Sequence, residues 1–106
     1  MSKKIMKVKE VTLEILKKRP PALQINSNGD VNSGGWTNGK LSAYIYVKPP
    51  ADGIYEFDFV ADEPTGIVIQ VVTPITAEPY IWDDFPSELK GVKVYGESGN
   101  YIIAKL

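Results

Sequence analysis

Residues 40–61 read KLSAYIYVKPPADGIYEFDFVA, and this stretch indicates the fold class. Apolar residues occupy every second position of the first run: Leu41, Ala43, Ile45 and Val47. The second run alternates in the same way, with Tyr55, Phe57 and Phe59 on one face and Glu56 and Asp58 on the other. A period of two is typical of half-buried β-strands, and the PPADG segment between the runs is rich in turn-forming residues. The stretch therefore predicts two strands joined by a turn.

The same pattern continues in both directions along the chain. It predicts about seven short strands and no sustained helix, at residues 11–16, 22–26, 40–48, 54–61, 67–75, 92–96 and 101–106. The Asn28-Gly29 pair favours a tight hairpin, because both residues tolerate positive φ. The run IVIQVVTPI, residues 67–75, is nearly all apolar and β-branched, which is typical of a central strand covered on both faces.

Regular short strands separated by turns predict an all-β protein. We expect a single antiparallel β-sandwich domain spanning residues 1–106, immunoglobulin-like and with about seven strands. A small barrel such as an OB-fold is the alternative architecture. Residues 76–91 hold two prolines and no sustained period, so they are expected to be irregular, with one helical turn possible at PSELKG.

Residues 52–59, DGIYEFDF, resemble the start of strand F in immunoglobulin-like and fibronectin-like domains. Gly53, Tyr55 and Phe57 match the glycine, the tyrosine and the buried position of that motif, although antibody domains have cysteine where Phe57 stands. The resemblance implies a sandwich in which the tyrosine hydroxyl bonds to nearby backbone. The whole chain also resembles small uncharacterised β-domains of bacteria, and that resemblance implies no function.

Composition narrows the chemistry that the chain can perform. The chain lacks cysteine and histidine, so thiolate chemistry, the usual neutral-pH general base and the commonest zinc ligands are missing. We therefore expect no catalytic residues, no metal and no cofactor. Residues 26–41, NSNGDVNSGGWTNGKL, do not form a calcium loop, because Val31 and Thr37 stand where an EF-hand needs glycine and glutamate. Their spacing does not match a phosphate-binding loop either.

Aromatic residues supply the candidate binding sites. If one strand continued without a bulge from Trp36 to Tyr46, then Trp36, Tyr44 and Tyr46 would share its outer face. Tyr80 and Trp82 form a second set. Flat aromatic groups beside amides and hydroxyls suit sugar rings or a protein partner. The alternative is structural: Trp36 closes one end of the sandwich, and Tyr80 and Trp82 cap another edge of the core.

These observations predict a non-catalytic binding or assembly module. The first hypothesis is protein–protein interaction or self-association, favoured by the apolar run at 67–75 and by lysines that crowd the first nineteen residues while acids crowd 52–88. Folding can also mix these charges. A carbohydrate-binding module is the second hypothesis, and a small enzyme using carboxylates such as Asp83 and Asp84 is the third.

Other partners and the location follow from charge and hydropathy. The formal net charge is −1, so nucleic acid is not an expected partner. No apolar run reaches the roughly 20 residues that span a membrane. The charged N-terminus does not resemble a signal peptide, so a soluble cytoplasmic protein is expected. An extracellular location would follow if a leader had been removed.

Overall fold

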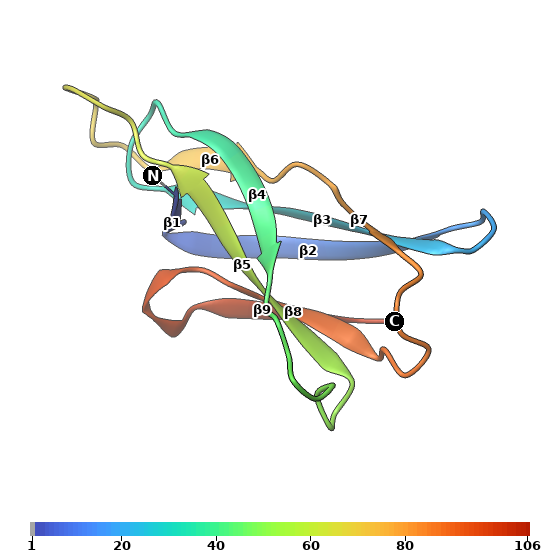
Figure 1. Cartoon of the computed structure of the whole chain (residues 1–106). Coiled ribbons are helices and arrows are strands. Elements are labelled where there is room, and N and C mark those ends of the chain that lie inside the picture. The colour runs from blue at the N-terminus through green and yellow to red at the C-terminus, as the bar shows by residue number, and fades with distance from the viewer. Residues whose placement is uncertain (1) are drawn as a thin grey trace.

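The computed structural model describes residues 2–106, which form nine strands and one short 3-10 helix, η1 (Glu97–Gly99). The strands are β1 (Ser2–Lys4), β2 (Lys7–Leu16), β3 (Ala22–Val31), β4 (Thr37–Ala43), β5 (Ile54–Asp62), β6 (Thr73–Thr76), β7 (Tyr80–Asp83), β8 (Gly91–Tyr95) and β9 (Tyr101–Lys105). They make two sheets that pack against each other (Figure 1). The all-β class and the two-sheet packing predicted from the sequence are therefore confirmed.

The first sheet, called here the β5 sheet, is organised around β5. β4 pairs with one side of β5, whereas β8 and β1 share the other side. β8 runs along the first half of β5 and β1 along its last residues, and β9 completes the sheet beyond β8. β1, β4, β8 and β9 therefore form one sheet with β5.

The second sheet, the β3 sheet, is organised around β3. The ten-residue strand β2 covers one side, and the short strands β6 and β7 follow each other along the other side. In Figure 1, β4 and β5 cross in front of β2 and β3, so the two sheets form separate layers. The core lies between these layers.

Alternation along β5 explains how the core is filled. Tyr55, Phe57 and Phe59 point inward, and Phe57 is only 1% exposed. Leu23 and Ile25 of β3 and Val92 and Val94 of β8 pack in the same buried cluster. Burial of apolar area at about 25 cal/mol per Å² is the main stabilising term in a domain of this size.

One strand pair differs from the predicted antiparallel sandwich. β5 and β8 pair in parallel, with Ile54 opposite Gly91 and Asp58 opposite Tyr95. The chain leaves the β5 sheet after Asp62, pairs with β3 through β6 and β7, and returns beside β5 in the same direction. The all-antiparallel prediction is wrong for this pair, because alternation specifies the faces of a strand but not its neighbours.

The predicted hairpin at Asn28-Gly29 is wrong. Both residues lie inside β3, where Asn28 pairs with Glu10 and Gly29 with Val8 across a β-bulge in β2. A Cβ on Gly29 would overlap the carbonyl oxygen of Lys7 and lie 2.5 Å from Cδ1 of Ile5. A glycine inside a strand often marks a bulge or a close approach of another backbone, and Gly29 does both.

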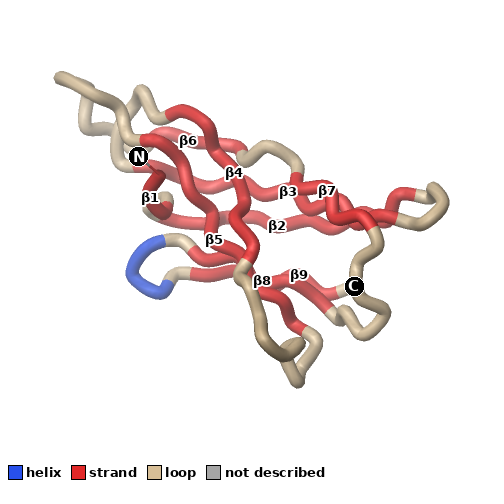
Figure 2. The backbone as a smooth tube through the Cα atoms, viewed as in Figure 1, coloured by secondary structure: helices blue, strands red, loops and turns tan. Residues whose placement is uncertain are grey.

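The predicted central strand at residues 67–75 is wrong as well. β6 begins only at Thr73, and residues 67–72 lie in the long loop between β5 and β6. Figure 2 shows this loop as a tan segment that extends beyond the ends of the strands. The segment predicted to be the best covered is therefore among the most exposed.

Two irregularities change the predicted 40–48 strand. Regular pairing of β4 with β5 ends at Ala43, although the backbone N–H of Tyr44 still donates to the carbonyl of Glu56 at 3.0 Å. At the other end, a register shift between Thr37 and Lys40 forms a bulge, with Asn38 at a φ of 56°. A bulge reverses the faces that follow it, so Trp36 does not continue the face of Tyr44.

The tyrosine corner implied by DGIYEFDF differs in its hydrogen bond. Gly53 has a φ of 72°, which favours glycine, and Phe57 is buried as the motif requires. The hydroxyl of Tyr55, however, lies 3.1 Å from the side-chain oxygen Oε1 of Glu88. The implied bond to nearby backbone is therefore wrong. The turn before β8 places the carboxylate of Glu88 beside the hydroxyl, which bonds to it instead.

Candidate functional site

The outer face of the β5 sheet carries a connected group of polar and aromatic side chains. Because Tyr55, Phe57 and Phe59 point inward, Glu56 and Asp58 point outward from β5. The parallel neighbour β8 places Lys93 and Tyr95 beside them. These side chains come from strands that are 37 residues apart in sequence, as shown by the pairing of Glu56 with Lys93 and of Asp58 with Tyr95.

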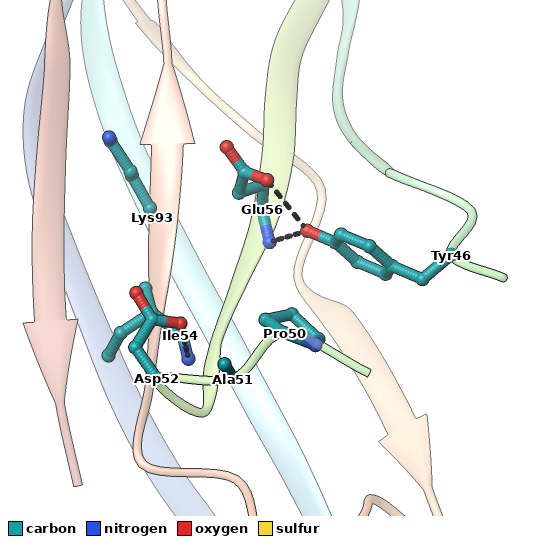
Figure 3. Close-up of a pocket in the computed structure, with 7 residues that line it drawn as sticks. All are labelled: Tyr46, Pro50, Ala51, Asp52, Ile54, Glu56 and Lys93. Carbon is teal, nitrogen blue, oxygen red and sulfur yellow. Dashed lines mark hydrogen bonds between the residues drawn. The ribbon is translucent and has the colours of Figure 1, made fainter. Parts of the chain in front are cut away.

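Glu56 is the centre of this group. Tyr46 donates from its hydroxyl to Oε1 of Glu56 at 3.0 Å and accepts the backbone N–H of Glu56 at 2.8 Å (Figure 3). Tyr95 donates to Oε2 of the same carboxylate at 2.6 Å. Hydrogen bonds to an ionised acceptor are stronger than neutral ones, so the two tyrosines hold this carboxylate in one orientation.

A row of aromatic rings continues from Glu56 across the sheet. The ring of Tyr95 lies 5.9 Å from that of Tyr44 and 6.0 Å from that of Tyr101, measured between centroids. Nζ of Lys93 lies 4.1 Å from the ring centroid of Tyr101 and 4.9 Å from that of Tyr95. This spacing is suited to cation–π attraction. The charged and polar groups of this face therefore interact mainly with one another.

The hydroxyls of Tyr44, Tyr46 and Tyr95 keep their protons at neutral pH and donate hydrogen bonds to carboxylates. Burial, together with the hydrogen bond to Asp58, raises the pKa of Tyr44 to about 12. Burial also raises the pKa of Tyr46 to about 12. The hydrogen bond to Glu56 raises the pKa of Tyr95. These shifts favour protonated hydroxyls that hold carboxylates in place, and they do not favour a tyrosinate base.

A pocket of about 470 Å³ opens beside Glu56. It is lined by Tyr46, Pro50, Ala51, Asp52, Ile54, Glu56 and Lys93. Figure 3 shows the 50–52 segment below the pocket and the side chains of Glu56 and Lys93 above it. Asp52 is positioned by its own loop, because its Oδ1 accepts the backbone N–H of Ile54 at 3.0 Å. The volume is within the usual range of small-molecule sites, about 300–1,000 Å³.

Of the aromatic residues predicted to bind, Trp36 lies apart from this pocket. Its side chain is half-buried against the core, and its Nε1 donates to Oγ of the buried Ser33 at 3.1 Å. Tyr44, by contrast, bonds to Asp58 on the outer face of the β5 sheet, whereas Tyr46 lies at the edge of this sheet, where its ring packs 5.6 Å from that of the inward-facing Tyr55. The structure therefore brings Tyr44 and Tyr46 together and separates them from Trp36, as the bulge at Asn38 requires.

The second predicted set packs into the sandwich. The ring of Tyr80 lies 5.1 Å from that of Phe57, and the ring of Trp82 lies 5.3 Å from that of Tyr55, both nearly perpendicular. Edge-to-face contacts of this kind stabilise cores. Tyr80 and Trp82 occupy β7, a strand that the sequence pattern did not predict because prolines flank it.

The sequence did not predict three residues of this group as site residues: the central acceptor Glu56 and its neighbours Lys93 and Tyr95. Alternation in VKVYG places Lys93 and Tyr95 on one face of their strand, so one signal was present. What was missing was the pairing of β5 with β8, which joins segments separated by β6 and β7. No local pattern encodes that pairing.

Charges are mixed rather than segregated. Four lysines form salt bridges with acids from distant segments: Lys3–Glu63, Lys4–Asp58, Lys9–Asp30 and Lys18–Asp83. Within residues 2–106, no group of three or more acidic, histidine or cysteine side chains could hold a metal ion. Opposed charged faces therefore give no support to head-to-tail association.

Exposed apolar side chains gather in two loops instead. In the loop between β5 and β6, Ile67 is 104% exposed and Ile69 78% exposed, and Val71 and Val72 are more than half exposed. The loop is nevertheless anchored, because Gly34 donates its N–H to the carbonyl of Ile69 at 3.4 Å. In the loop after β4, Ile45 and Val47 are fully exposed at 98% and 103%.

Two packed sheets, a tyrosine-lined outer face and a small open pocket define a compact all-β protein. No family model, curated protein or solved structure matches this chain. None of the helices in residues 2–106 has the length and apolar character needed to cross a membrane.

Proposed function

We propose that this protein is a non-catalytic binding module that docks a protein partner through the apolar segment Ile67–Val72. The observation that carries the proposal is the exposure of four β-branched side chains, Ile67, Ile69, Val71 and Val72, on one loop. Exposed apolar clusters of this kind are typical of interaction sites. Full burial of one such side chain contributes about 1.5–3 kcal/mol, so covering several of them supplies substantial binding energy.

The loop is held in place rather than free in solution, which supports a docking role. Val68 points back toward Gly35, where a Cβ would meet its Cγ1 at 3.5 Å, while its neighbours Ile67 and Ile69 point outward. Binding residues on loops that are positioned by a rigid scaffold lose little conformational entropy on association. A stable interface buries on the order of 800 Å² per partner, so the partner must also contact residues around this loop.

The double substitution Ile67→Asp with Ile69→Asp tests this proposal. We expect it to abolish capture of the partner, because two carboxylates cannot be buried in an apolar interface without a large penalty. The free energy of unfolding should change by no more than about 0.5 kcal/mol, since both side chains are exposed. The measurement is a quantitative pull-down with wild-type and variant protein, together with a urea titration of each.

The matched control for this experiment is the double substitution Ile45→Asp with Val47→Asp. These two residues of the loop after β4 are as exposed as Ile67 and receive the same charge change on a different loop. Equal capture by wild type and both variants contradicts the proposal. Self-association is the form of the proposal in which the partner is a second copy, and sedimentation velocity over a concentration series distinguishes it from a different partner.

A second candidate function, carbohydrate binding, is favoured by the pocket at Glu56. Its walls combine carboxylates, an ammonium group and apolar carbons, which suit hydroxyls and the C–H faces of a sugar ring. Methyl glycosides of glucose, galactose and mannose should shift the amide resonances of Asp52, Ile54 and Lys93 at millimolar concentration. Ala51→Leu should remove those shifts by filling the pocket. Absence of shifts with all three sugars contradicts this candidate.

The immunoglobulin-like assignment belongs to the same proposal. It is supported by two packed sheets, by Gly53 at positive φ and by the buried Phe57 of the predicted corner. The parallel pairing of β5 with β8 differs from the antiparallel sheets of standard immunoglobulin domains. The proposed relationship therefore concerns sandwich architecture and not strand order.

A further inference from the structure

The pocket beside Glu56 has a lining of two kinds. Pro50, Ala51 and Ile54 contribute carbon atoms, called here the carbon wall, whereas Asp52 and Glu56 contribute carboxylates. The volume of about 470 Å³ accommodates a monosaccharide, and the carbon wall suits the C–H groups of a sugar ring. The charge of the remaining lining therefore decides which sugars can bind.

Both carboxylates of the pocket lack a basic partner. Neither Asp52 nor Glu56 forms a salt bridge within residues 2–106, whereas Asp58, two residues further along β5, has its Oδ1 3.7 Å from Nζ of Lys4. Oδ1 of Asp52 accepts the N–H of Ile54, and no hydrogen bond to its Oδ2 forms among the described residues. Asp52 therefore has a charged oxygen available for a ligand.

Glu56 also retains acceptor sites. Each of its oxygens accepts one tyrosine hydroxyl, Oε1 from Tyr46 at 3.0 Å and Oε2 from Tyr95 at 2.6 Å. An ionised carboxylate can accept about four hydrogen bonds, so roughly two sites remain. Glu56 is half-buried, which reduces the screening of its charge by salt. It can therefore attract a cation that enters the pocket.

Lys93, the third charged residue of the lining, does not neutralise both acids. Its Nζ lies 4.1 Å from the ring centroid of Tyr101 and 4.9 Å from that of Tyr95, so the ammonium group is directed along the aromatic row. Figure 3 shows this nitrogen pointing away from Asp52. Two carboxylates and one ammonium group leave the lining with a net negative charge.

We propose that this pocket selects sugars that carry a primary ammonium group, such as a 2-amino-2-deoxyhexose, over neutral and acidic sugars. The ammonium group donates to the carboxylates of Asp52 and Glu56, while the ring lies against the carbon wall. Hydrogen bonds between two charged groups are roughly twice as strong as neutral ones, so they supply the selectivity. This inference rests on the carbohydrate-binding candidate, and it is independent of the docking loop Ile67–Val72.

A charge series of glycosides tests the inference. Methyl β-glucosaminide, methyl β-glucoside and methyl β-glucuronide share a pyranose ring and are cationic, neutral and anionic at slightly acidic pH. In titrations of isotope-labelled protein, the glucosaminide should bind about tenfold more tightly than the glucoside, and the glucuronide should not bind. The resonances that shift should be the amides of Asp52, Ile54 and Lys93.

Three results of this series would overturn the inference. Equal affinities for the three glycosides would show that charge is not recognised. Tightest binding of the glucuronide would show that Lys93 selects an anion. Tighter binding of Nα-acetyl-lysine methylamide than of the glucosaminide would show that the pocket takes an amine without a sugar ring.

Two matched substitutions locate the ammonium group. Asp52→Asn keeps an acceptor for the N–H of Ile54 but removes the charge, so it should weaken glucosaminide binding about fivefold and leave glucoside binding unchanged. Asp58→Asn removes the same charge from β5 at a residue that does not line the pocket, and it should change neither affinity by more than about twofold. Equal losses in the two variants would contradict binding of the ammonium group in the pocket.

The neutral glycoside distinguishes failure of this inference from failure of the candidate on which it rests. If the glucoside and the glucosaminide bind equally, the carbohydrate-binding candidate stands and selection by charge is wrong. If no glycoside shifts these amides at millimolar concentration, both are wrong. The docking loop is tested separately by Ile67→Asp with Ile69→Asp, so its outcome depends on neither result.

Discussion

Phe57→Ala should lower the free energy of unfolding by about 4 kcal/mol, the range measured when a buried phenylalanine is truncated in a well-packed core. Phe57 is buried between the sheets, and its ring meets those of Tyr80 and Trp82 at centroid distances of 5.1 and 5.8 Å. The substitution removes the transfer free energy of the ring, leaves a cavity and breaks two edge-to-face contacts across the sandwich. Small domains are stable by about 5–15 kcal/mol, so a large share of that stability is lost.

Urea denaturation followed by tryptophan fluorescence measures this effect. Trp82 reports on the cavity directly, because its ring contacts that of Phe57. Ile67→Ala is the control, since it truncates an apolar side chain that is fully exposed, and it should change the free energy of unfolding by no more than about 0.5 kcal/mol. A loss below about 1 kcal/mol for Phe57→Ala would contradict the central position of this ring in the core.

Gly29→Ala should destabilise the protein by about 3 kcal/mol, at the upper end of the cost of overpacking. A Cβ at this position would overlap the backbone carbonyl oxygen of Lys7 and crowd Ile5, which is fully buried. Relief requires a shift of β2 at its bulge, and the register of β2 with β3 depends on that bulge. The cost therefore comes from backbone displacement and not only from one close contact.

Gly34→Ala provides the matched control for Gly29→Ala. A Cβ at Gly34 has no heavy atom within 4 Å, and Gly34 does not have positive φ. Reduced backbone entropy of the unfolded chain should stabilise this variant by up to about 1 kcal/mol. Thermal unfolding of both variants under the same conditions is the measurement, and similar melting temperatures would show that β2 and β3 do not approach closely at Gly29.

The aromatic residues selected from the sequence divide between the core and the surface for a clear physical reason. Tyr44 reaches the outer face because the alternation that begins at Leu41 extends to it, whereas Tyr46 follows the end of β4 and packs at the sheet edge against Tyr55. Trp36 was predicted to share that face only if no bulge intervened, and the bulge at Asn38 is present. Bulges depend on how two strands fit together, so the single strand did not reveal it.

The loop at residues 67–72 shows where local patterns mislead. An apolar, β-branched run predicts a covered strand, because covered strands have that composition. Cover, however, is supplied by other parts of the chain, and here β6 pairs with β3 only from Thr73 onward. The exposed run is thus a surface that the domain itself leaves unpaired, and that inconsistency is the basis of the proposed docking role.

The amino-acid sequence by itself determined the β-structure, the inward face of β5 and the absence of cysteine and histidine. These properties depend on residue type and on a period of two, which are local. The tertiary structure alone decided that β8 lies parallel beside β5 and joins Lys93 and Tyr95 to Glu56. It also decided that Gly29 sits under a bulge and that Ile67–Val72 stays exposed. Strand neighbours are chosen by packing among distant segments, and no short stretch of sequence contains that information.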